Sequence, residues 1–163
     1  MNLVPVRDVF DVHYGVNLEL NALKLDPRGI NFVSRSERNN GVSARVRKLT
    51  SVTPISAGAI SVAGGGSVMA SFLQPEPFYS GRDLYYLVEA KGIKLSEAAK
   101  LYYCCCLRAN RYRFNYGRQA NRTLRDILIP APESIPNWAT TVPLKSLEAK
   151  AQLLSKTLTK HFG

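Results

Sequence analysis

Residues 58–74, GAISVAGGGSVMASFLQ, hold two apolar segments separated by three consecutive glycines. Short apolar segments on either side of a glycine cluster are typical of two β-strands joined by a turn. A glycine-rich loop can also bind phosphate, but this one lacks the Gly-Lys-Ser/Thr of a Walker loop and the GxGxxG spacing of a dinucleotide site. The sequence therefore predicts a tight turn within a sheet at residues 64–67.

The flanking sequence extends this sheet in both directions. Asn39-Asn40-Gly41 predicts a turn, because Asn and Gly tolerate positive φ, and residues 30–52 around it predict a hairpin with a basic loop at its tip. Residues 17–26 favour a short helix or an irregular segment that ends at Pro27. Four segments are strand-like: residues 9–14, 29–34, 44–52 and 84–88.

Residues 96–110, SEAAKLYYCCCLRAN, predict the main helix because they are rich in strong helix formers. Ala98, Leu101, Tyr102 and Cys105 would share one of its faces. The three cysteines are consecutive, at 104–106, so they point in different directions and make a poor disulfide or metal-binding set. We predict buried, reduced thiols on a helix, with a redox or metal role as the alternative.

Positive charge is concentrated in two stretches of a chain whose formal net charge is +10. Residues 28–48 hold six Arg or Lys and one acid, Glu37, whereas residues 108–125 hold six Arg and no acid. Membranes and acidic proteins also attract cations. The planar guanidinium, however, suits bidentate contact with phosphate or with the edge of guanine, so this arginine-only stretch favours nucleic acid.

Residues 111–116, RYRFNY, alternate polar and aromatic side chains. A period of two predicts a strand with Tyr112, Phe114 and Tyr116 on one face. These aromatic rings either stack on bases or pack into the core, and the sequence leaves both alternatives open.

Prolines at 130, 132 and 136 predict the end of the domain at residue 132 and a proline-rich linker over residues 133–143, because proline stops regular elements. Residues 144–163 then predict a coiled-coil-type helix for assembly or packing. Two heptads are marginal alone in water, so this helix would pack on the domain or on a partner. Its apolar residues are spaced three, four, three and four apart: Leu144, Leu147, Ala151, Leu154 and Leu158.

The sequence resembles the target recognition domain of the DNA-specificity subunit of type I restriction-modification systems. The matching pieces come in the expected order over about residues 8–155, and Asn39–Gly41, Phe78–Gly81 and Tyr112–Gly117 are the most specific. They are VFDVHYG (9–15), INFVSRSERNNGVS (30–43), GAISVAGGGSVMASFLQPEPFYSGRDLYYL (58–87) and RYRFNYGRQANRTLRDILIPAP (111–132).

The resemblance implies an α+β (mixed α/β) domain, with a curved, mainly antiparallel sheet, flanking helices and a C-terminal coiled-coil-type helix. It implies a non-catalytic, sequence-specific binder of double-stranded DNA that serves a DNA methyltransferase subunit. We also expect no cofactor and no metal, and a cytoplasmic location by default. Typical specificity subunits hold two such domains. We therefore expect either a homodimer of this chain or a stand-alone binder, as in phage or mobile-element proteins that reuse the domain.

We expect DNA contacts from both basic stretches and their loops. Arg reads guanine and Asn or Gln reads adenine, although Asn39 and Asn40 alternatively only shape the turn. Six to eight phosphate contacts would give a slope of about −5 to −7 for log K against log salt. The candidate residues are Arg35, Arg38, Asn39, Asn40, Arg45, Arg47, Lys48, Arg82, Arg108, Arg111, Arg113, Tyr116, Arg118, Gln119, Asn121 and Arg122.

Two other classes of function are alternatives to DNA binding. A nuclease needs clustered carboxylates, and the acids of this sequence form no acid-x-Lys or paired-acid motif in a suitable setting. A module that binds a methyltransferase or other partner through the C-terminal helix, without DNA, is favoured by the leucine spacing but not by the arginine-only stretch. No apolar run approaches the length of a membrane span, and the N-terminus lacks the pattern of a secretory signal.

Overall fold

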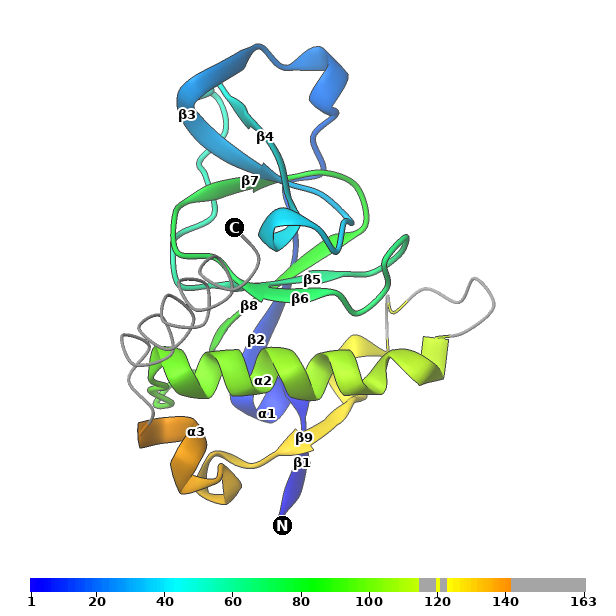
Figure 1. The fold of residues 1–163 in the computed structure, drawn as a ribbon, viewed down its shortest axis with the longest axis vertical. Helices are drawn as coiled ribbons and strands as arrows, with labels where there is room; N and C mark the ends of the chain where they lie inside the picture. Colours follow the sequence, from blue (N-terminus) through cyan, green and yellow to red (C-terminus); the bar gives the residue numbers. More distant parts are fainter. Residues whose placement is uncertain (115–119, 121–122, 142–163) are drawn as a thin grey trace, which may run out of the picture.

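A four-stranded antiparallel sheet lies at the centre of the computed structural model, which describes residues 1–114, 120 and 123–141 (Figure 1). Strands β5 (Ile60–Ala63) and β6 (Ser71–Leu73) flank the three glycines, so the predicted strand–turn–strand unit is confirmed. All four residues of β5 are buried. The order of the sheet is β2 (Phe10–Tyr14), β8 (Leu84–Glu89), β5, β6.

A second sheet holds the predicted hairpin. Strand β3 (Leu25–Val33) pairs antiparallel with β4 (Val42–Val46) and parallel with β7 (Phe78–Ser80). The hairpin is confirmed, but its returning strand begins at Val42 and ends at Val46, rather than spanning residues 44–52. Pro27 does not end the preceding segment either. It lies within β3, where the register shifts between Leu25 and Ile30 and a ladder N–H is not required.

The two ends of the domain meet in a short third sheet. Strand β1 (Leu3–Pro5) pairs with β9 (Leu128–Pro130), and α1 (Val6–Val9) follows β1 directly. The region predicted as a linker carries regular elements where the structure describes it: the 3₁₀ turn η5 (Pro132–Ser134) and α3 (Asn137–Thr141). Proline begins η5 instead of stopping it, because an N-terminal position needs no N–H partner.

Helix α2 (Glu97–Ala109) confirms the predicted helix, and the Ser96 hydroxyl caps it by accepting from the Ala99 N–H at 3.2 Å. The face shared by Ala98, Leu101, Tyr102 and Cys105 is not the buried face of this helix. Cys105 is exposed, whereas the buried residues of α2 are Ala99, Tyr103, Cys104 and Leu107. The cysteine run makes both faces of the helix apolar, so the spacing alone did not choose between them.

The main core lies between the central sheet and α2. The ring of Tyr103 meets Phe10 edge-on with 5.2 Å between centroids, and its hydroxyl donates to the Pro130 carbonyl at 2.8 Å. All three cysteines are free thiols on α2, as predicted, but of the three only Cys104 is buried: Cys105 is exposed and Cys106 is half-buried. Burial raises the pKa of Cys104 to about 12, which keeps that thiol protonated. Among the described residues, no helix is long and apolar enough to cross a membrane.

The strand predicted at residues 111–116 does not form where the structure describes it. Asn110–Phe114 is a 3₁₀ turn, η3, that continues directly from α2. The Asn110 side-chain amide donates to the Cys106 carbonyl at 2.9 Å and closes the helix end. Phe114 is buried in the core and Tyr112 is 67% exposed, so their alternation does not reflect one face of a sheet.

Candidate nucleic-acid interface

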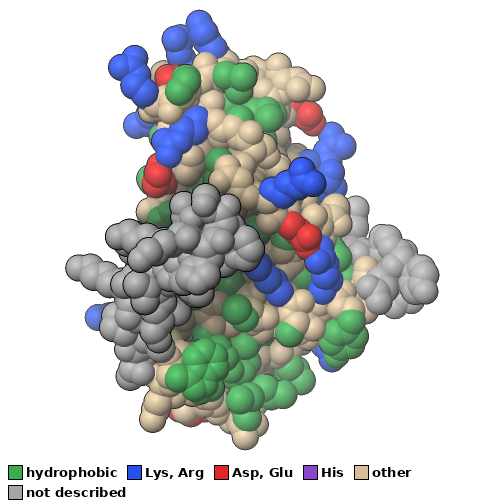
Figure 2. Space-filling view, in the orientation of Figure 1, with side chains coloured by type: hydrophobic (Ala, Val, Ile, Leu, Met, Phe, Trp, Pro, Cys, Tyr) green, Lys and Arg blue, Asp and Glu red, His purple; other side chains and the backbone are tan. Residues whose placement is uncertain are grey.

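Lysine and arginine side chains gather at the end of the molecule formed by β3 and β4 (Figure 2). Arg47 and Lys48 follow β4 directly, and Arg28 lies in the irregular part of β3. All three side chains are exposed, and none forms an ion pair with another described residue. Their charge is therefore available to a phosphate.

The turn Asn39–Gly41 is held by its own asparagines. Asn39, Asn40 and Gly41 have φ values of 48°, 56° and 77°. The Asn40 amide donates to the Leu73 carbonyl at 3.0 Å, and the Gln74 amide donates back to the Asn40 carbonyl at 2.9 Å. The Asn39 amide donates within the turn. These contacts favour the alternative in which the asparagines shape the turn. Arg38, which directly precedes the turn, is exposed and supplies the positive charge there.

Four of the nominated arginines are paired with carboxylates of the same chain. Arg45 is the most fixed, because its guanidinium donates to both Glu76 oxygens, at 2.9 and 2.8 Å, and to the Gly29 carbonyl. Partners in all four pairs are 31 to 74 residues apart in sequence, so no local signal pointed to them. The pairs are Arg35–Asp83, Arg45–Glu76, Arg82–Glu19 and Arg111–Glu37.

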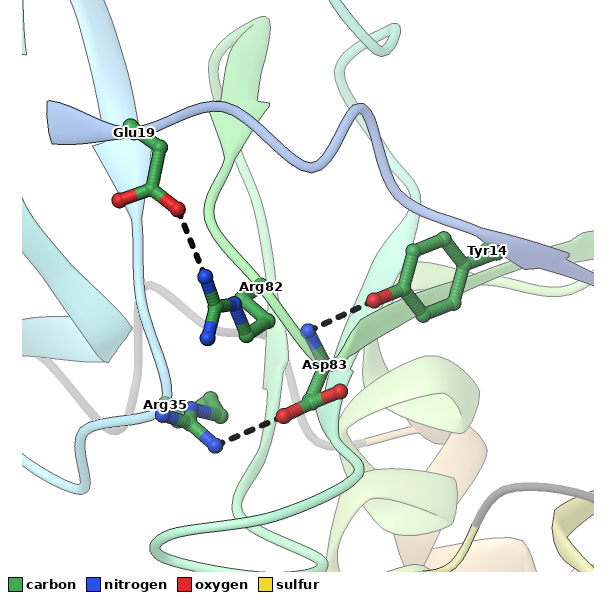
Figure 3. Close-up of polar contacts among 5 residues, drawn as sticks. All are labelled: Tyr14, Glu19, Arg35, Arg82 and Asp83. Carbon is green, nitrogen blue, oxygen red and sulfur yellow. Dashed lines mark hydrogen bonds and ion pairs between the residues drawn. The ribbon is translucent and has the colours of Figure 1, made fainter. Parts of the chain in front are cut away.

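Figure 3 shows how Asp83 connects the basic loop to the central sheet. Its carboxylate accepts from Arg35 at 2.8 Å, and its backbone N–H donates to the Tyr14 hydroxyl at 2.9 Å. Its carbonyl accepts from the Gly64 N–H at 2.8 Å, and the Gly64 carbonyl accepts from Ala120 at 3.0 Å. Ala120 belongs to the second basic stretch, so that stretch is tied here to the loop that carries Arg35.

The glycine turn is needed for this close approach. A Cβ at Gly64 would lie 2.8 Å from the ring of Tyr85, and one at Gly65 would lie 3.2 Å from the Arg35 guanidinium. Gly66 has a φ of 62°, and a Cβ there would lie 3.1 Å from the Cβ of Arg35. The glycines thus provide room for Arg35, in agreement with the predicted turn.

The two basic stretches also meet at the C-terminal end of α2. Arg108 donates to the Ser71 carbonyl at 3.1 Å and covers the ring of Phe72, 4.4 Å from its centroid. Arg111 pairs with Glu37 of the loop between β3 and β4. A hollow of about 330 Å³ lies between them and is lined by Glu37, Met69, Ala70, Phe72, Arg108 and Arg111.

Three nominated residues, Asn39, Asn40 and Arg108, hydrogen-bond to carbonyls of the chain without an ion pair. The other nominated residues fall into three groups. Arg38, Arg47, Lys48 and Arg113 are exposed and form no ion pair within the described part of the chain. Arg35, Arg45, Arg82 and Arg111 are paired. Outside the described residues lie Tyr116, Arg118, Gln119, Asn121 and Arg122, and also Leu144, Leu147, Ala151, Leu154 and Leu158.

Solved structures from type I restriction-modification systems superpose on this chain. The type I restriction-modification S subunit from M. genitalium superposes with a TM-score of 0.64 at 19% identity, over 97% of this chain and 41% of that one. The HsdS subunit from Thermoanaerobacter tengcongensis gives 0.61 at 13% identity, over 98% and 37%. The chain has the fold of type I specificity subunits.

A third match comes from a structure concerned with complex assembly and conformational transition of the type I R-M system. It gives a TM-score of 0.69 at 14% identity, over 98% of this chain and 41% of that one. The chain therefore spans about two fifths of the length of the three structures. No family model and no curated protein matches the sequence. The α+β fold expected from the resemblance is confirmed.

Proposed function

We propose that this chain is a target recognition domain: a non-catalytic, cytoplasmic module that binds double-stranded DNA sequence-specifically within a restriction-modification system. The observation that carries the proposal is the specificity-subunit fold over 97–98% of the chain. The exposed cations beside β4 and in the loop before it add support, because phosphate contacts supply much of the affinity of such proteins.

Loops rather than an inserted helix would contact the DNA. Arg38, Arg47 and Lys48 lie on the loops at the two ends of β4, and Arg113 lies beyond the C-terminal end of α2. Exposed, unpaired cations suit phosphate oxygens, which fix the register of a protein on the duplex but carry no sequence information. Sequence would be read by other groups at the same surface.

The test is selection of bound duplexes from a random pool with the full chain, followed by affinity measurements on the selected duplex and on a scrambled one. We expect one enriched sequence, bound roughly 1,000-fold or more tightly than the scrambled duplex at 0.15 M salt. Equal binding of the two duplexes would contradict a recognition role. Incubation with plasmid and Mg²⁺ or Mn²⁺ should leave the plasmid intact, and cleavage would contradict the non-catalytic role.

Assembly is a second part of the proposal, through a methyltransferase subunit or a second copy of the chain. The observation that favours an interface near the C-terminal segment is Trp138 of α3, which is 64% exposed while its ring meets Tyr102 at 5.7 Å. The regularly spaced apolar residues of the C-terminal segment follow α3 in sequence: Leu144, Leu147, Ala151, Leu154 and Leu158. Changing Leu147 and Leu154 to Lys should abolish any dimer seen by light scattering yet retain weak DNA binding. A wild-type chain that stays monomeric at micromolar concentration would contradict the homodimer.

A further inference from the structure

Ion pairing divides the arginines of the interface into two kinds. Unpaired cations release counterions when they meet a phosphate, so they add affinity without selecting a sequence. A paired arginine is already partly neutralised and its rotamer is fixed, so it gains less from a phosphate. Its remaining N–H donors still point in set directions, which is what bidentate contact with a base edge requires.

Arg35 meets these conditions best. Its Nη1 donates to Asp83 at 2.8 Å, and it makes no other side-chain hydrogen bond to a described residue, so donors of the fork stay available. Its side chain is 38% exposed and that of Asp83 is 20% exposed. The Arg82–Glu19 pair, at 65% and 68%, is a solvated surface pair of the kind that fixes little.

We propose that Asp83 is a specificity-determining residue: its carboxylate holds the Arg35 guanidinium so that its free edge reads the O6 and N7 acceptors of a guanine. The inference rests on the proposed DNA-recognition function and adds to it the base that is read and the residue that positions its reader. Asp83 itself acts through Arg35 and need not touch the DNA.

The carboxylate of Asp83 can be separated from the structural work of the same residue. Asp83 has a φ of 52°, and its backbone groups bond to Tyr14 and Gly64. Its carboxylate bonds, within the described part of the chain, to Arg35. Asparagine adopts positive φ as readily as aspartate and has nearly the same shape. Asp83→Asn therefore removes the charge and keeps the turn.

The experiment compares the wild type, Arg35→Ala and Asp83→Asn on the selected duplex and on duplexes with each base pair substituted in turn. We expect Arg35→Ala to lose about 5- to 150-fold discrimination at one G·C pair and to leave the other positions unchanged. Asp83→Asn should lose part of that discrimination at the same pair, while its affinity for the scrambled duplex stays equal or rises. Unfolding midpoints of the variants establish that all three fold.

Asp126→Asn is the matched control, because it also removes a paired carboxylate. Asp126 pairs with Arg7 on α1, at the end of the molecule away from β3 and β4 (Figure 1). It should leave discrimination at every position unchanged. Losses spread evenly over all positions, or at different positions for Arg35→Ala and Asp83→Asn, would overturn the inference. A wild type that selects no sequence would overturn the proposed function and the inference with it, whereas a selective wild type matched by Asp83→Asn would overturn the inference alone.

Discussion

Replacing Arg47 and Lys48 together with alanine should weaken DNA binding in a way that depends on salt. Both side chains are exposed beside β4 and have no ion pair with a described residue. Each phosphate contact contributes about 0.9 to the slope of log K against log salt. In the double variant, the slope of log K against log salt should therefore be shallower by about 1.8. With equal affinities at 1 M salt as the reference, this corresponds to an affinity about 60-fold lower at 0.1 M salt.

The slope of log K against log salt for the wild type tests whether the paired arginines keep their carboxylate partners when DNA binds. Besides Arg108, which packs on the ring of Phe72, four nominated cations form no ion pair in the described part of the chain, and four phosphate contacts predict a slope of about −3.6. Arg118 and Arg122, outside the described residues, would bring it to about −5.4. A slope of about −9 would mean that the four paired arginines also leave their carboxylates for phosphate, contrary to the division of roles argued for Arg35.

Fluorescence anisotropy with a labelled duplex, titrated between about 50 and 300 mM NaCl, measures both quantities. Lys91→Ala with Lys94→Ala is the matched control, because it removes two exposed cations from the turn between β8 and α2. The control should keep the wild-type slope. An unchanged slope in the Arg47/Lys48 variant would show that these two residues do not contact phosphate. An equal change in the control would show that net charge and not this surface drives binding.

Three further predictions concern the fold. Tyr79→Phe should lower the free energy of unfolding in urea by about 1–3 kcal/mol, because the buried hydroxyl bonds two backbone groups after β4 at 3.0 and 3.1 Å. Iodoacetamide at pH 8 should label exposed Cys105 before Cys104, whose pKa burial raises to about 12; mass spectrometry of the peptides would show the order. Burial alone would raise the pKa of Glu89, but hydrogen bonds, including one from Lys100, lower it below its ordinary value near 4.5. The stability it contributes is therefore present above that value and lost as pH falls through the folded pKa. Glu89→Gln should destabilise the protein at pH 7, and the difference from the wild type should shrink as pH falls below 4.5.

The hairpin and the glycine turn were predictable because their signals are local. Asn39-Asn40-Gly41 supplies three consecutive residues that tolerate positive φ, and all three adopt it. The glycines at 64–66 lie between two apolar segments of strand length, which pair as β5 and β6. Turn residues and the side chains that flank them are neighbours in sequence, so the physics that decides them can be read directly.

The buried face of α2 and the structure at 111–114 were not predictable in the same way. In α2, the apolar residues 98, 101, 102 and 105 lie close in sequence to the buried residues 99, 103, 104 and 107. Packing of the helix against β6 and β9 decides which of the two sets is buried. The alternation at 111–116 has the period of a strand, yet a strand needs a partner edge. The chain emerges instead from a capped helix end and continues as a 3₁₀ turn.

The ion pairs of the interface were the feature that the sequence predicted least. A count of cations treats Arg45 and Arg47 alike, since both fall in one basic stretch. In the fold, Arg45 faces Glu76 and the Gly29 carbonyl, whereas Arg47, two positions along and beyond the end of β4, reaches solvent. Pairing with a distant carboxylate changes an arginine from a source of counterion release into a fixed set of donors. The number of basic residues therefore overestimates the salt dependence of binding, and the acids that lie among them carry the information about which arginines can read a base.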